Sequence, residues 1–221
     1  MKVTKHIDWI TKTEDFIKDR FFGEGTGHDW FHIDRVRKNA VFIAQKEGAN
    51  VLQVEMAALL HDIADHKFHN GDLNEGPKQA NAWLQKLELG PKEIKAIVTI
   101  IDEVSFKGAQ VDTPVSSAES ACVQDADRLD AIGAIGVARA FAFGGAHDRL
   151  LYDPAIEPTM HGDFESYRLD KSGTIAHFYE KLLLLKDRMQ TETGKKLAAQ
   201  RHTFMETYLE QFFREWNMRE V

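Results

Sequence analysis

Residues 56–68 read MAALLHDIADHKF, an apolar run that ends in the dipeptide His61-Asp62. The apolar side chains recur at three- and four-residue spacing, which is typical of one buried face of a helix. They are Met56, Leu59, Leu60 and Ile63. The segment therefore predicts a buried helix that carries two strong metal-ligand types at its end. Burying a carboxylate without a partner is costly, and a divalent cation bound by both side chains would remove that cost.

The same helical spacing continues through most of the chain, and alternating strand patterns bounded by hairpin turns are absent. We therefore expect an all-α fold. The expected helices cover residues 4–22, 29–47, 51–64, 74–89, 91–104, 116–125, 127–142, 172–190 and 192–218. Three segments between them contain glycine where a left-handed residue would end a helix, namely EGAN (47–50), LELGP (87–91) and FGGAHD (143–148). The five prolines fall where a helix begins or where the chain is irregular.

The chain length of 221 residues favours one compact multi-helix domain over residues 1–221. Residues 144–173 contain the longest irregular stretch, a long insertion that we expect to act as a lid over a binding site. The alternative is an ordinary surface loop between two helices.

Composition and charge limit the partners of the protein. The net charge is −7, and no cluster of Lys and Arg is present of the kind that binds polymeric nucleic acid. No apolar run is long enough to span a membrane, and the first residues lack the apolar core of a signal peptide. The chain has one cysteine, Cys122, so an intrachain disulfide is excluded. We expect a cytoplasmic protein with a small anionic substrate.

Two more ligand-type residues lie on other expected helices. His32 lies in GHDWFHIDRV (27–36), near the start of an amphipathic helix. Asp127 lies in a run of small and apolar residues, DADRLDAIGAIGVARAF (125–141), that predicts a largely buried helix. Each residue has an ordinary alternative when taken alone: His32 a hydrogen-bonded core histidine, His61-Asp62 a surface pair, and Asp127 a helix N-cap.

The order His32, His61-Asp62, Asp127 resembles the motif of the HD-domain superfamily of metal-dependent phosphohydrolases. The two stretches quoted above and HFYEKLLLLKDRM (177–189) resemble a bacterial subgroup of stand-alone HD proteins, similar to nucleoside triphosphate pyrophosphohydrolases. The resemblance covers essentially the whole chain.

This resemblance implies an all-α fold and one divalent metal ion at the four motif residues. Dinuclear relatives add two well-separated histidines between Asp62 and Asp127, whereas this interval contains only His66 and His69. The resemblance favours Mn²⁺, and Mg²⁺, Co²⁺, Ni²⁺ or Fe²⁺ also suit the ligand types.

The resemblance further implies hydrolysis of a small phosphorylated substrate, most concretely a nucleoside triphosphate to the monophosphate and pyrophosphate. Other reactions of the same class are nucleoside monophosphate and cyclic-nucleotide hydrolysis. An alternative from a different class is a metal-dependent nucleotide sensor without turnover. A third is a helical scaffold in which the metal is structural.

Catalytic and substrate-binding candidates surround the motif. Asp65 is the general-base candidate, by resemblance to related hydrolases, and its alternative role is to pair with Lys67 or to cap the helix. Lys67 is the first candidate to offset phosphate charge. Further candidates for substrate binding are His28, His66, Arg128, Arg139, His177 and Lys181. For Arg128 the alternative is a structural salt bridge with Asp130, and for His177 and Lys181 a solvated helix surface.

Overall fold

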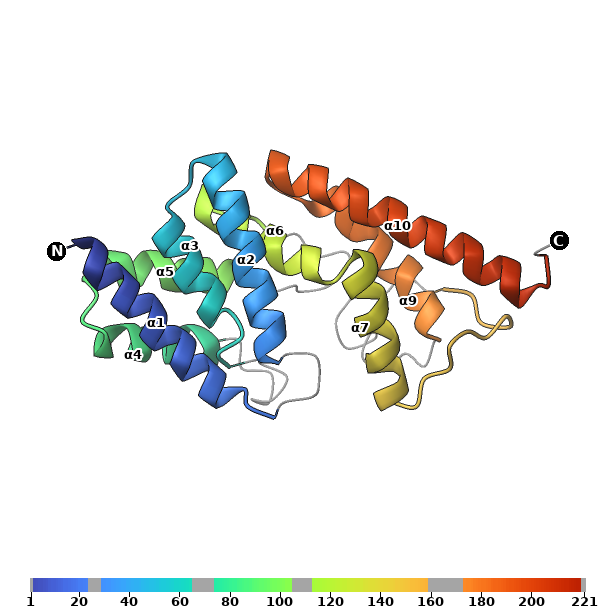
Figure 1. Ribbon diagram of the computed structural model, residues 1–221, viewed down its shortest axis with the longest axis horizontal. Coiled ribbons are helices and arrows are strands. Elements are labelled where there is room, and N and C mark those ends of the chain that lie inside the picture. Colours follow the sequence, from blue (N-terminus) through green and yellow to red (C-terminus); the bar gives the residue numbers. More distant parts are fainter. Residues whose placement is uncertain (1, 24–28, 65–73, 105–112, 159–172, 220–221) are drawn as a thin grey trace. The chain divides into compact units, whose positions relative to one another are not determined.

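The computed structural model describes the chain except residues 1, 24–28, 65–73, 105–112, 159–172 and 220–221 (Figure 1). Every regular element in the described part is helical, which confirms the expected all-α class. By packing, the chain divides into two compact units. Among the described residues, unit 1 comprises those up to Val104 and Thr113–Asp127, and unit 2 comprises those from Arg128 onward. The expectation of one domain over residues 1–221 stays a prediction.

Unit 1 is built around the predicted apolar helix. Its elements are α1 (Lys2–Arg20), α2 (Trp30–Glu47), α3 (Val51–Leu60), α4 (Glu75–Lys86), α5 (Pro91–Val104) and most of α6 (Ala118–Asp130). α3 packs against α1, α2 and α5, and α4 packs against α5 (Figure 1). The stretch from Met56 to Leu60 is completely buried. The end of α3 is therefore fixed by apolar packing on several sides.

Side-chain and glycine caps set the ends of α2. The Asp29 carboxylate accepts a hydrogen bond from the backbone N–H of His32 at 2.8 Å, which is an N-cap. Gly48 adopts a left-handed φ of 72° at the other end, as the segment EGAN predicted. In the other two glycine segments the left-handed residues are instead Glu88 and Asp148, with φ of 57° and 54°.

Unit 2 contains α7 (Gly133–Ala146), α9 (Thr174–Glu180), the short 3₁₀ helix η2 (Leu182–Arg188) and the long α10 (Glu192–Trp216). α10 packs against α7 and η2, and α9 packs against η2 and α7 (Figure 1). Phe178 of α9 is fully buried. Its ring is about parallel to the ring of Tyr208, and the two ring centroids are 6.0 Å apart. The centroid of the Phe141 ring lies 6.1 Å from that of Phe178. These aromatic contacts join α9 to α10 and α7.

The expected helices 116–125, 127–142 and 172–190 have different boundaries in the structure. The expected break at residue 126 is absent, because α6 continues through Asp127 to Asp130, and the chain turns at residues 131–132. The turn leads into Gly133, whose left-handed φ of 76° suits glycine. A Cβ atom there would also lie only 2.9 Å from Cγ of Arg201. The expected helix 172–190 is divided at Lys181, whose φ of −142° and ψ of −57° interrupt the helix between α9 and η2.

Within the described residues, no single helix is both long and apolar enough to cross a membrane. Taken together, the bent pair of helices α6 and α7 is long and apolar enough, but this rests on length and composition only.

The buried aromatic ring in unit 2 provides a test of this packing. We expect Phe178→Ala to lower the free energy of unfolding by about 3–5 kcal/mol, because it removes a large buried side chain and leaves a cavity. The matched control is Phe204→Ala on α10, where the side chain is 47% exposed and the expected loss is within about 0.5 kcal/mol. Urea denaturation followed by circular dichroism measures both, and equal losses would contradict the described core.

Candidate metal centre

Three elements of unit 1 carry the four motif residues. His32 lies in the first turn of α2, next to the N-cap of that helix. His61 and Asp62 directly follow α3, in the turn 61–64. Asp127 lies in the C-terminal half of α6, inside the helix, so the alternative of a helix N-cap is wrong. The structure brings all four residues together.

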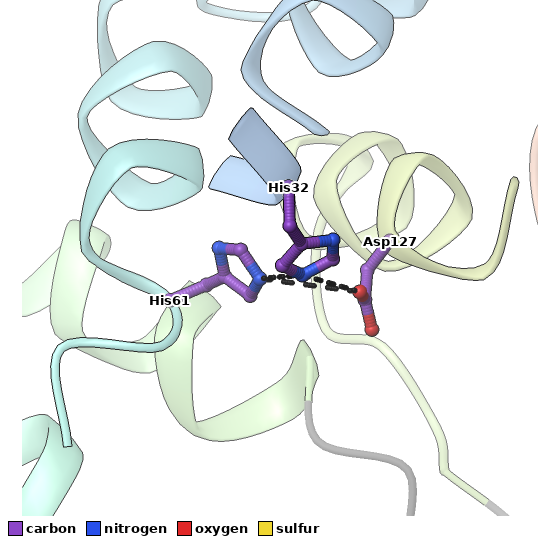
Figure 2. Close-up of side chains that lie close together, drawn as sticks. All are labelled: His32, His61 and Asp127. Atoms are coloured by element: carbon purple, nitrogen blue, oxygen red, sulfur yellow. Dashed lines mark hydrogen bonds and ion pairs between the residues drawn. The ribbon is translucent and has the colours of Figure 1, made fainter. Parts of the chain in front are cut away.

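The four side chains face one point with one donor atom each. Nε2 of His32 lies 3.3 Å from Nε2 of His61, 3.3 Å from Oδ2 of Asp62 and 3.6 Å from Oδ1 of Asp127. Nε2 of His61 lies 3.4 Å from Oδ2 of Asp62 and 3.9 Å from Oδ1 of Asp127. Figure 2 shows both imidazole rings and the Asp127 carboxylate pointing toward this common space.

A backbone carbonyl orients the ring of His61. Nδ1 of His61 lies 2.8 Å from the carbonyl oxygen of Ala58. An N–H at Nδ1 donates to this carbonyl, which leaves the lone pair of Nε2 directed at the other three donor atoms. Metal-binding histidines commonly have such a partner for the second ring nitrogen. Sequence reasoning missed Ala58 because every residue has a carbonyl, so nothing in the sequence marks this one.

The donor set is enclosed on its histidine side and open on its carboxylate side. The His32 and His61 side chains are each 2% exposed, whereas those of Asp62 and Asp127 are 17% and 28% exposed. Partial exposure of the two carboxylates leaves access for water or a substrate. A catalytic metal site needs this access, whereas a structural site is closed by protein ligands.

The donor atoms fit one divalent ion. Two ligands bonded at about 2.1 Å lie about 3.0–3.4 Å apart at angles between octahedral and tetrahedral. The three distances among His32, His61 and Asp62 fall in this range, and Asp127 lies slightly farther out at 3.6 and 3.9 Å. Two imidazoles with two carboxylates also suit a borderline divalent cation. These residues can therefore hold the metal that the sequence resemblance implies.

Four predicted residues lie outside the described part of the chain. They are His28, Asp65, His66 and Lys67. The expected helix 51–64 is shorter in the structure, since α3 ends at Leu60 and residues 61–64 form a turn. Their roles, and the expected lid over 144–173, of which residues 159–172 are not described, stay predictions.

Two predicted arginines hold the end of α6. Arg139 of α7 donates to the Asp130 carboxylate at 2.7 Å, and that carboxylate is almost fully buried. Arg128 is 4% exposed and donates to the backbone carbonyl of Arg188. Both guanidinium groups thus have structural contacts in unit 2. Their expected contact with substrate stays a prediction.

His177 and Lys181 lie together at the end of α9. The backbone N–H of Lys181 donates to the His177 carbonyl at 3.1 Å. Burial, followed by the positive charges of Lys181 and Arg149, lowers the pKa of His177 to about 3. His177 is therefore a neutral imidazole near neutral pH. Backbone hydrogen bonds bring the segment that follows Arg149 to α9, among them that from Thr174 N–H to the Leu150 carbonyl at 2.8 Å.

Known proteins resemble this chain over nearly its full length. The HD domain family model matches residues 30–132. The protein YpgQ of Bacillus subtilis is 38% identical over 209 residues, which span 94% of this chain and 93% of YpgQ. A crystal structure of an HD-superfamily hydrolase from Bacillus thuringiensis is 44% identical, with a TM-score of 0.75 over 96% of this chain and 98% of that one.

A crystal structure of B. subtilis YpgQ in complex with ADP gives the same TM-score, 0.75, at 34% identity over 96% of each chain. With the helical fold and the donor set, these likenesses establish the class of protein. The chain belongs to the HD-domain superfamily of hydrolases.

The lowered pKa of His177 predicts a pH dependence of stability. Unfolded His177 has an ordinary pKa of about 6.5, so between about pH 3 and 6.5 the unfolded chain binds a proton that the folded chain does not. The contribution of His177 to stability is therefore complete above about pH 6.5 and falls as the pH decreases toward 3. We expect the His177→Asn variant to lose stability less steeply with acid.

Urea denaturation at several pH values measures this slope. In parallel, the ring resonances of His177 in NMR spectra, assigned by comparison with His177→Asn, should stay constant between pH 5 and 8. An inflection within that interval would contradict the neutral state.

Proposed function

We propose that this HD-superfamily protein is a metal-dependent phosphohydrolase that acts on nucleotides, and that it cleaves a nucleoside triphosphate to the monophosphate and pyrophosphate. The observation that carries the proposal is the open set of four donor atoms from His32, His61, Asp62 and Asp127. The ADP complex of YpgQ supports a nucleotide as the substrate class. Mn²⁺ is the proposed metal.

In the proposed reaction, water attacks the α-phosphorus, and the bond from that phosphorus to the bridging oxygen breaks to release pyrophosphate. A divalent ion held by the four donor residues would supply positive charge to polarise a phosphoryl oxygen and to lower the pKa of water. His32 and His61 contribute neutral nitrogen donors, and Asp62 and Asp127 contribute the charge that balances the ion. Asp65 accepts the proton of the attacking water, and Lys67 offsets negative charge that develops on the phosphate chain.

Removal of a donor should abolish metal binding and hydrolysis together. We expect His61→Ala and Asp62→Ala to lose the metal, because each removes one of four ligand side chains. His147→Ala is the matched control, since His147 is an exposed histidine of unit 2. Metal content by mass spectrometry after reconstitution with Mn²⁺ decides the matter. Full metal content in both donor variants would rule out the proposed site.

Loss of the general base Asp65 should have a different effect from loss of a metal ligand. We expect Asp65→Asn to keep the metal while the rate of the chemical step decreases by about 10²–10⁴-fold, the usual contribution of a positioned base. Single-turnover kinetics with the Mn²⁺-loaded variant measures the step. Wild-type rates would show that the proton goes to another group.

A nucleotide panel identifies the reaction. The Mn²⁺-loaded protein is incubated with nucleoside triphosphates, diphosphates, monophosphates and cyclic nucleotides, and ³¹P NMR follows the products. Pyrophosphate from a triphosphate supports the proposal, whereas orthophosphate points to a different phosphohydrolase. Saturable binding of a nucleotide without any product would favour the alternative of a sensor.

A further inference from the structure

Gln124 of α6 is a completely buried polar side chain one turn before Asp127. Its amide nitrogen Nε2 donates to two backbone carbonyls, that of Glu103 at 2.8 Å and that of Thr113 at 3.2 Å. Glu103 is in the last turn of α5, and Thr113 precedes α6. The side chain therefore uses both of its N–H bonds to attach α6 to α5 and to the segment that leads into α6.

The carboxylate of Glu103 makes a second attachment, between α5 and the segment that leads into α6. It accepts a hydrogen bond from the backbone N–H of Ser116 at 3.0 Å. Burial raises the pKa of Glu103, but the hydrogen bonds from the Ser120 side chain and from Ser116 outweigh it, so the pKa is lowered and the carboxylate stays charged. Ser117 caps the start of α6, since its Oγ accepts from the N–H of Ser120 at 3.0 Å.

The hydrogen bonds of Gln124 and Glu103 fix the position of α6. The metal centre depends on this position, because α6 carries Asp127. His32, His61 and Asp62 come from α2 and the end of α3, which pack directly on each other. Asp127 alone comes from α6, and its Oδ1 is the donor atom farthest from the others, at 3.6 and 3.9 Å. A small shift of α6 away from them would take this oxygen out of reach of a shared ion.

We propose that Gln124 is a positioning residue for the metal centre: it holds α6, through the carbonyls of Glu103 and Thr113, at the place where Asp127 completes the donor set. Gln124 lies about 4.5 Å from Asp127 along the helix axis, at 1.5 Å per residue. A helix transmits a displacement over one turn with little loss, because its backbone hydrogen bonds keep it rigid. The inference rests on the proposed metal site, but not on the proposed substrate.

The test compares metal binding in two variants that each disturb a buried hydrogen bond of unit 1. Gln124→Met keeps the size of the side chain and removes both donated hydrogen bonds. The control is Thr13→Val in α1, since Thr13 is completely buried and accepts from Nε1 of Trp83 at 2.9 Å, away from α6. Both variants are expected to unfold at lower urea concentration than the wild type.

Titration with Mn²⁺ alone, followed by the EPR signal of the free ion, measures affinity without any substrate. We expect about 10-fold weaker binding in Gln124→Met, the usual lower range for loss of a group that orients a ligand. Binding in Thr13→Val should stay within about twofold of the wild type. The visible spectrum of bound Co²⁺ should change in Gln124→Met only.

Equal Mn²⁺ affinity in the two variants would overturn the inference and leave Gln124 a purely structural residue. If Gln124→Met does not fold, Gln124→Asn takes its place in the titration. The shorter Asn side chain cannot reach both carbonyls, so this variant should also bind Mn²⁺ more weakly. A wild-type protein that binds no Mn²⁺ would refute the metal site itself, and the inference with it. A protein that binds Mn²⁺ but hydrolyses no nucleotide would refute only the proposed function.

Discussion

The structure of unit 1 depends on holding two carboxylate oxygens 3.3–3.9 Å from the nitrogens of two buried imidazoles. Asp62 and Asp127 carry negative charge in partly buried positions, which is costly without a compensating cation. The apolar packing of α3 fixes the end of that helix, the Asp29 cap fixes the first turn of α2, and the contacts of Gln124 connect α6 to α5. Each element delivers its donor to one point, so the site exists only when all three are in place.

α6 serves both units, because the chain divides directly after Asp127. The last turn of α6 belongs to unit 2, where Arg201 donates to the Leu129 carbonyl and Arg139 binds the Asp130 carboxylate. The carbonyls at the end of a helix lack partners within that helix, so a guanidinium there satisfies one of them. Helix α6 therefore ends in polar contacts of unit 2, while its first turns make polar contacts with α5 in unit 1.

The sequence predicted the helical class and the donor residues for different reasons. Periodicity located α2 and α5 closely, because a buried helix needs apolar residues on one face. It misplaced the break near Asp127, because small residues on both sides of Asp127 make helix and turn similar in pattern, and the left-handed Gly133 decided the position. Left-handed Glu88 and Asp148 were missed since glycine is the usual residue at such ends. The contacts of Gln124 were not predictable, because an amide that binds backbone carbonyls has no sequence signature.

The charge of the donor set determines how much positive charge other residues must supply to a phosphorylated substrate. The carboxylates of Asp62 and Asp127 would neutralise one divalent ion, so a phosphorylated substrate would need further positive groups from residues outside the donor set. Within unit 2, taken by itself, His177 stays a neutral imidazole, because burial and the charges of Lys181 and Arg149 lower its pKa to about 3. A group with that pKa binds no proton near neutral pH, so His177 is unsuited to proton transfer there.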